Sequence, residues 1–173
     1  MRKVLLPPCA CVGGWVEFHS SGGEGFVSTA IHERVERLRA GGEPAKILQM
    51  RSGWAVLGAQ QFLRGYSLLL PDPVVPDLNA LTGGERAAFL DDMAALGDAV
   101  QKATGARRIN YALFGNAEPA LHAHVIPRFD DEPEALRSAH PWSYDWSAAP
   151  RFNLAEHGRL LEAIRAALTK SVR

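Results

Sequence analysis

The sequence predicts an α+β fold in which a five-stranded, mainly antiparallel sheet packs against helices on one face. Three observations support this. Segments with apolar residues at helical spacing alternate along the chain with short β-type segments. Adjacent strands have connections short enough for hairpins, and the last connection is too short for a parallel return. The length of 173 residues suits one domain, 1–173, with a core of its own.

The first and last helices are predicted from their end signals. The first covers residues 29–40, with Ser28 as its N-cap and Gly41-Gly42 after its last turn. The last begins near Asn153, which would form a capping box with Glu156. Its apolar stripe consists of Leu154, Leu161, Ile164 and Leu168.

The middle helix and the strands complete the pattern. A capping box of Thr82 and Glu85 opens a helix over residues 83–104, and Gly105 occupies the position of a C-terminal cap. The predicted strands cover residues 46–51, 54–57, 66–70, 108–114 and 121–126, the last ending at Pro127. We interpret residues 1–27 as an N-terminal arm and residues 130–173 as a C-terminal extension that carries the tail helix.

Composition limits the function classes. Nineteen basic and nineteen acidic residues cancel, so no broad charge favours nucleic acid or an anionic membrane as a partner. No apolar run approaches the length of a membrane span, and Cys9 and Cys11 are too close together to suggest a disulfide framework. We therefore expect a cytoplasmic protein whose partners are small molecules. Cys9, Cys11 and His19 form too weak a pattern to predict zinc.

The fifth predicted strand carries two histidines on one face. His122 and His124 alternate with Leu121, Ala123 and Val125, whose apolar side chains mark the core face. The histidine pair, His122 and His124, would therefore face a cleft or solvent. Three interpretations are open at this point: two surface histidines, a His-x-His metal site of the cupin type, or a nucleophile that attacks phosphorus. The metal interpretation is the weakest, because no third ligand occupies a matching strand position.

The stretch Ala120-Leu-His-Ala-His-Val-Ile-Pro-Arg128 resembles the signature of the histidine triad (HIT) family, particularly its dinucleoside polyphosphate hydrolases. Gly65-Tyr66 is similar to a Gly-His pair of that family, and the long helix follows in the expected order. One residue departs from the signature. Ala120 stands where the family has its first histidine, which leaves open what group orients the nucleophile.

The resemblance implies a HIT-like fold and a two-step reaction. His122 would attack the α-phosphate of a nucleotide, and the nucleotidyl-histidine would then be hydrolysed by water or transferred to an acceptor. It implies diadenosine polyphosphates as substrates first and adenosine phosphoramidates next. No metal would act in the covalent step, although Mg²⁺ can arrive with the substrate. It also implies a homodimer. The alternatives are a nucleotide-binding regulatory module with little turnover and the cupin-type metal enzyme.

Further site residues come from the same resemblance. His124 would contact the phosphate, Asn116 would hold phosphate oxygens, and Arg128 would offset the charge of a polyphosphate. Trp54 would line the base pocket, although a tryptophan in the core is the commoner case. Glu118 is interpreted mainly as a residue that shapes its loop. The aromatic segment, residues 140–146, would either cap the base or fasten the tail to the domain.

Overall fold

The computed structural model describes residues 28–171. The predictions for residues 1–27, including Cys9, Cys11 and His19, lie outside this part of the chain. The order of elements is α1 (Ala30–Arg39), β1 (Lys46–Gln49), β2 (Gly53–Leu57), β3 (Ser67–Pro71), a 3-10 turn (Leu78–Ala80), α2 (Gly83–Thr104), β4 (Arg108–Leu113), β5 (Ala123–Arg128), α3 (Glu134–Arg137), a second 3-10 turn (Pro141–Ser143) and α4 (Leu154–Ser171).

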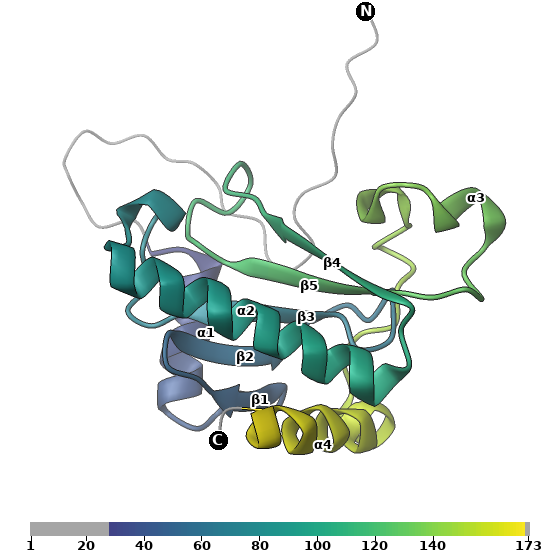
Figure 1. The fold of residues 1–173 in the computed structure, drawn as a ribbon, viewed down its shortest axis with the longest axis horizontal. Coiled ribbons are helices and arrows are strands. Elements are labelled where there is room, and N and C mark those ends of the chain that lie inside the picture. Colours follow the sequence, from purple (N-terminus) through teal and green to yellow (C-terminus); the bar gives the residue numbers. More distant parts are fainter. Residues whose placement is uncertain (1–27, 172–173) are drawn as a thin grey trace, which may run out of the picture.

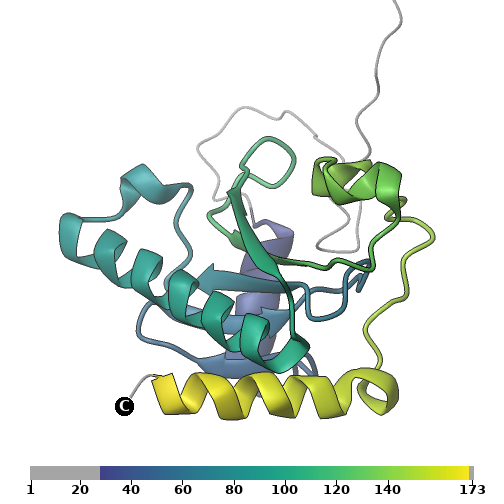
Figure 2. The ribbon, with the colours of Figure 1, turned by 45° about the vertical axis from the view of Figure 1, so that its right-hand side comes forward.

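One five-stranded sheet forms the centre of the molecule, with the strand order β1-β2-β3-β5-β4 (Figure 1). Every pairing in it is antiparallel. The α+β class and the antiparallel sheet predicted from the sequence are therefore confirmed. The long α2 runs across the sheet, and α4 lies beside it, as Figure 2 shows from a second angle.

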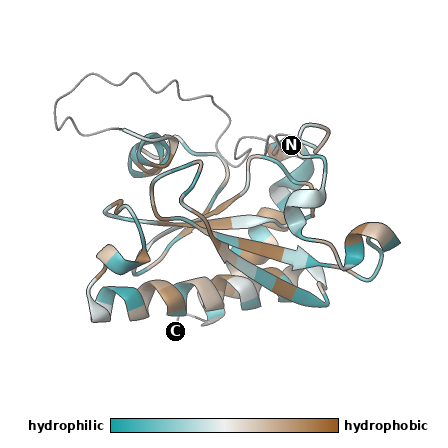
Figure 3. Cartoon of the chain, turned by 90° about the horizontal axis from the view of Figure 1, so that it is seen from above, coloured by the Kyte–Doolittle hydropathy of each residue, from teal (hydrophilic) through white to brown (hydrophobic). Residues whose placement is uncertain are grey.

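Helices cover both faces of the sheet, so the prediction of helices on one face is wrong. Apolar residues of α2 and α4 pack against Ala55, Leu69 and Val125 on one face. Ile31, Val35 and Leu38 of α1 belong to a second apolar cluster on the opposite face, with Val56, Leu68 and Ile126. The physical reason is that β2 and β3 are buried at every residue, so both of their faces need apolar cover. Seen from above, hydrophobic residues recur along the central strands (Figure 3).

The helix ends follow the predicted capping chemistry with three corrections. The box of Thr82 and Glu85 and the left-handed Gly105 both bound α2 as expected. However, α1 is capped by Thr29 rather than Ser28. The Asn153 side chain caps α4 by accepting from the Ala155 N–H, but its own N–H donates to His157 instead of Glu156. Leu154 is 57% exposed and lies outside the apolar stripe that Leu161, Ile164 and Leu168 form.

Strand β5 continues through Pro127, where the sequence predicts its end. Pro127 pairs with Ile109 of β4. The pairing with β3 has already stopped at Val125, so the last residues of β5 have a neighbouring strand on one side only. A proline without an N–H is tolerated in such a position. This extension is what carries Arg128 to the end of the sheet.

Within residues 28–171, no helix combines the length and the apolar composition needed to cross a bilayer.

Candidate active site

His122 lies in the extended segment that enters β5, and its ring is fixed by the backbone. Its Nδ1 is 2.8 Å from the carbonyl oxygen of Ala120. Because a carbonyl oxygen only accepts, Nδ1 must carry the hydrogen and donate it. The other nitrogen, Nε2, is then left with a free lone pair. The group that orients the ring is thus the main-chain carbonyl of Ala120.

His124 is held from the neighbouring strand by Tyr66, which directly precedes β3. The Tyr66 hydroxyl oxygen lies 2.6 Å from Nδ1 of His124, and the two rings are stacked with centroids 6.0 Å apart. Among the described residues, the phenol hydrogen has no other acceptor. Donation to Nδ1 therefore satisfies it, and this places the hydrogen of His124 on Nε2. The sequence resemblance matches Gly65-Tyr66 to a Gly-His pair but assigns Tyr66 no role.

The two imidazoles meet edge to face, with ring centroids 4.8 Å apart. Both Nε2 atoms are buried and have no hydrogen-bond partner in the described part of the chain. Since buried polar atoms in proteins are nearly always paired, two neighbouring unpaired nitrogens indicate a site rather than packing. The pair offers complementary chemistry: a lone pair on His122 beside an N–H on His124.

The histidine pair is closed off from solvent, contrary to the expectation that it faces a cleft or solvent. His122 is 1% exposed and His124 is fully buried. The Trp142 ring packs edge to face on His124 at 4.9 Å, and Phe114 contacts the same imidazole. Trp142 in turn packs against Trp146. The aromatic segment therefore contacts the histidine face of the sheet, whichever role it serves there.

Burial keeps both imidazoles neutral. Desolvation lowers the pKa of His122, while the hydrogen bond to the Ala120 carbonyl and the charge of Glu118 oppose the shift. Desolvation, with a smaller effect of His122, lowers the pKa of His124 to about 3. Burial also raises the pKa of the Tyr66 phenol, which therefore remains a hydrogen-bond donor at neutral pH. A neutral imidazole with a free Nε2 is the form that attacks phosphorus.

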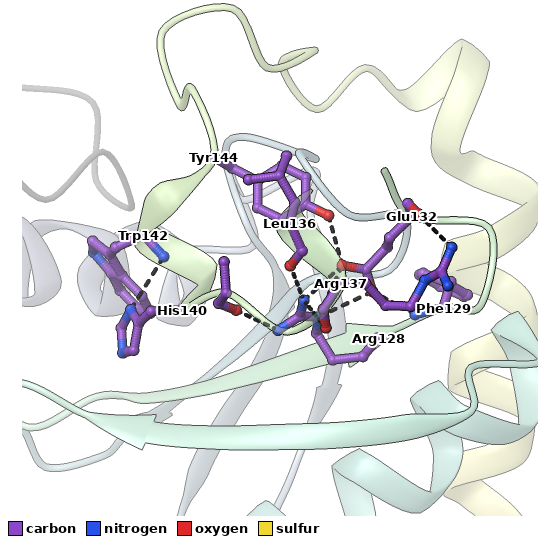
Figure 4. A network of polar contacts seen from close by, with 9 residues as sticks. Arg128, Phe129, Glu132, Leu136, Arg137, His140, Trp142 and Tyr144 are labelled. Carbon is purple, nitrogen blue, oxygen red and sulfur yellow. Dashed lines mark hydrogen bonds and ion pairs between the residues drawn. The ribbon is translucent and has the colours of Figure 1, made fainter. Parts of the chain in front are cut away.

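Arg128 lies within a network of polar contacts of its own (Figure 4). Its guanidinium donates to both carboxylate oxygens of Glu132 and to the carbonyl oxygens of Leu136, Arg137 and Ala139. At four residues along β5, it is about 13 Å from His124. The Tyr144 hydroxyl donates to the same Glu132 carboxylate at 2.6 Å. The network thus anchors the chain that leads into the aromatic segment. Because each nitrogen of the Arg128 guanidinium already donates within it, the geometry does not favour Arg128 as a phosphate ligand.

The other predicted site residues are dispersed. Asn116 is exposed in the loop between β4 and β5. Trp54 is buried on the histidine face of the sheet, where its indole N–H donates to Asp72 at 2.8 Å, and Lys46 lies over its ring. Glu118 is buried near His122, and its Oε1 has no partner among residues 28–171. The structure brings together His122, His124 and Tyr66.

The described residues include no group of three or more His, Cys, Asp or Glu side chains that could hold a metal ion. The cupin-type alternative requires such a group, with the histidine pair as two of its members. Tyr66 instead occupies Nδ1 of His124, and the Ala120 carbonyl occupies Nδ1 of His122. Each imidazole therefore offers its Nε2 atom to a ligand.

Comparison with solved structures identifies the fold. A histidine triad protein from Sinorhizobium meliloti 1021 superposes with a TM-score of 0.61 at 24% identity, over 78% of this chain and 93% of that one. A histidine triad protein from Marinobacter aquaeolei VT8 gives a TM-score of 0.60 at 21% identity, over 80% and 96%. A zinc-bound histidine triad family protein from Mycobacterium smegmatis gives 0.57 at 23% identity, over 78% and 93%. No family profile and no curated protein matches the sequence. The chain therefore has the HIT-like fold that its sequence predicts.

Proposed function

We propose that the protein is a nucleotide hydrolase or nucleotidyl transferase of the histidine triad type, with His122 as the nucleophile. The observation that supports this most strongly is the buried, unpaired Nε2 of a ring fixed through Nδ1. A nucleophile needs both features, because the lone pair must be free and its direction fixed. The likeness in fold to histidine triad proteins supports the same chemistry.

The reaction has two steps. The Nε2 lone pair of His122 forms a bond to the α-phosphorus as the bond from phosphorus to the leaving oxygen breaks. The N–H of His124 lies beside it and donates a hydrogen bond to that oxygen, which stabilises the negative charge as the leaving group departs as an anion and takes any proton from solvent. In the second step water, or an acceptor hydroxyl, attacks phosphorus and displaces Nε2. Tyr66 holds His124 in the tautomer that makes it the donor.

Diadenosine polyphosphates are the substrates we favour, and adenosine phosphoramidate is next. The covalent step needs only the imidazole nitrogens of this chain and the phosphate oxygens of the substrate. Mg²⁺ would be present only as an ion bound to the polyphosphate. Asn116 and Trp54 remain proposed contacts to phosphate and base. We also propose a homodimer built on the free edge of β4, where Tyr111 and Leu113 are exposed together with Leu90 of α2.

One observation favours a second candidate, a nucleotide-binding module with little turnover. Both Nε2 atoms are buried and Trp142 packs on His124, so a phosphate reaches these atoms only if the side chains around them move. Binding without release of AMP would identify this second function.

The deciding experiment traps the intermediate. Wild type, His122→Ala and the matched control His157→Ala are incubated with diadenosine tetraphosphate labelled at the α-phosphates and stopped in alkali, where a phosphohistidine bond survives. Label on wild type and the control, but not on His122→Ala, supports the proposal. Equal AMP release by His122→Ala refutes the nucleophile, and tight binding without AMP release by wild type supports the binding module.

A further inference from the structure

A second polar feature lies on the histidine face of the sheet, beyond Trp142. It is a cleft of about 520 Å³ between β4 and the chain that follows β5. We call it the arginine cleft, defined by Arg107, Arg108, Asn110, Arg137, Ser138 and His140. Cross-strand pairing places Arg108 opposite Arg128 and Ala112 opposite His124, so Arg108, Asn110 and the histidine pair share a face.

The cleft has more hydrogen-bond donors than its own acceptors can use. Its two carboxylates are already engaged, Asp130 with Arg107 at 2.8 Å and Glu132 with Arg128. Arg108 has no ion-pair partner among the described residues, and Arg137 donates only to the Glu132 carbonyl. Two guanidinium charges are therefore uncompensated in a chain whose total charge is zero.

The remaining polar groups add donors. The Nδ1 atom of His140 accepts a hydrogen bond from the main-chain N–H of Trp142, so in the neutral ring Nε2 carries the hydrogen. Asn110 and Ser138 contribute an amide and a hydroxyl. Planar guanidinium forks with amide, hydroxyl and imidazole donors suit a ligand with several anionic oxygens, and a chain of phosphates has more of these than a single carboxylate.

We infer that the arginine cleft binds the distal phosphates of the substrate, those beyond the α-phosphate that His122 attacks. Ala112 of β4 pairs with His124, and Arg108 lies four residues before Ala112, so the span from Arg108 to Ala112 is about 13 Å. A chain of several phosphates covers such a span, whereas the small leaving group of a phosphoramidate does not. The inference rests on the proposed function, and it selects dinucleoside polyphosphates within it.

The test compares two substrates with the same nucleotide half. Arg108→Ala is expected to raise KM for diadenosine tetraphosphate about tenfold, the effect of losing one charge-assisted hydrogen bond. It should leave kcat/KM for adenosine 5′-phosphoramidate within about twofold. The matched control is Arg159→Ala, which removes an exposed arginine of α4 and should change neither value. Equal losses with both substrates, or no loss with the tetraphosphate, overturn the inference.

A binding measurement separates failure of the cleft from failure of the proposed function. Calorimetry with inorganic tripolyphosphate and the full chain requires no turnover. Binding to wild type and to Arg159→Ala, with loss in Arg108→Ala, supports the cleft even if neither substrate is cleaved. If tripolyphosphate inhibits cleavage of diadenosine tetraphosphate but not of adenosine 5′-phosphoramidate, the cleft is assigned to the distal phosphates of the substrate. Binding that survives in Arg108→Ala, or no binding to wild type, refutes it.

Discussion

At the residue scale, the Tyr66 hydroxyl determines which nitrogen of His124 carries hydrogen. Tyr66 is fully buried, and its phenol has one acceptor, the Nδ1 atom 2.6 Å away. Gly58 allows the ring to lie there, since a Cβ on residue 58 would overlap it. Tyr66 acts through His124 and is therefore a positioning residue.

Tyr66→Phe keeps the ring and removes the donor. We expect kcat to fall about 10- to 100-fold with KM nearly unchanged, as is typical when a partner that orients an active-site histidine is lost. Nitrogen NMR should show the His124 hydrogen distributed over both ring nitrogens. The control is Tyr111→Phe, because the Tyr111 hydroxyl makes no hydrogen bond to residues 28–171. Wild-type kcat together with an unchanged tautomer would exclude the role.

The depressed pKa of His124 makes stability depend on pH. Unfolded histidine titrates near 6.5, whereas His124 in the folded chain titrates at about 3. Between these values the unfolded state binds the extra proton, so stability is fully present above pH 6.5 and is lost progressively as the pH falls toward 3. Denaturation at several pH values should show a smaller slope for His124→Gln than for wild type across this window. Identical slopes would contradict the shift.

Sequence reasoning at this scale found the histidines but not their surroundings. The His-x-His spacing and period-two alternation place His122 and His124 on one face, and the structure agrees. Their burial could not be predicted, because Trp142 covers His124 from a segment that no periodicity links to the strand. The role of the Ala120 carbonyl could not be predicted either. Every residue has a carbonyl, and only the folded chain shows which one lies within hydrogen-bond distance of His122.

At the scale of elements, Glu132 joins the end of β5 to the aromatic segment. Its carboxylate accepts from Arg128, the Tyr144 hydroxyl and the Phe129 N–H. These charged and backbone donors lower the pKa of Glu132 even though burial opposes the shift, so the group is ionised at neutral pH. The chain from β5 to Tyr144 contains only short helical turns, so this cluster is its principal anchor.

Glu132→Gln should loosen that chain selectively. Losing one charge of a buried pair costs about 3 kcal/mol. Here we expect that cost to lower the free energy of local opening rather than that of global unfolding. Hydrogen exchange is expected to accelerate in residues 133–144 while the amides of α2 and the sheet keep their protection. Asp130→Asn, which breaks the exposed pair with Arg107, is the control and should cost less than about 1 kcal/mol. Uniform acceleration across the sheet would contradict a local anchor.

An element can be predicted from the sequence to the extent that the signals for it lie within its own residues. Helix α2 carries its own capping box, apolar stripe and terminal glycine, and its bounds are as predicted. Strand β5 passes the predicted end because Pro127 is tolerated only once β3 has stopped pairing, which depends on another strand. The position of α1 on the second face likewise depends on β2 and β3 being apolar on both sides.

At the scale of the whole molecule, β4 leaves one edge of the sheet free. Its residues Tyr111 and Leu113, which share the α2 face of the sheet, are more than a third exposed, as is Leu90 of α2. An exposed apolar edge of this kind is normally covered by another chain or defended by charge. Gly97 of α2 allows the Tyr111 ring to lie close to the helix, which extends the apolar surface across both elements.

Leu113→Asp should therefore convert a dimer into a monomer. At a two-fold interface each new carboxylate would lie near the same carboxylate of the second subunit. The repulsion between the two charges and the cost of removing both from water oppose dimer formation. Light scattering after size-exclusion chromatography measures the mass directly. Leu154→Asp is the control, because that leucine is exposed at the start of α4 and should leave the mass unchanged. A monomeric wild type at micromolar concentration would refute the homodimer.

In the proposed reaction, the aromatic side chains packed on His124 also bear on the fate of the covalent intermediate. Side chains that shield Nε2 from solvent before the reaction will shield the phosphoramidate bond afterwards, so its lifetime depends on how often the cover opens. An acceptor that binds under the cover then competes with a small local supply of water. Loosening Glu132 would shift product from transfer toward hydrolysis. Under the proposed mechanism, the packing of Trp142 on His124 would thus govern the choice between transfer and hydrolysis.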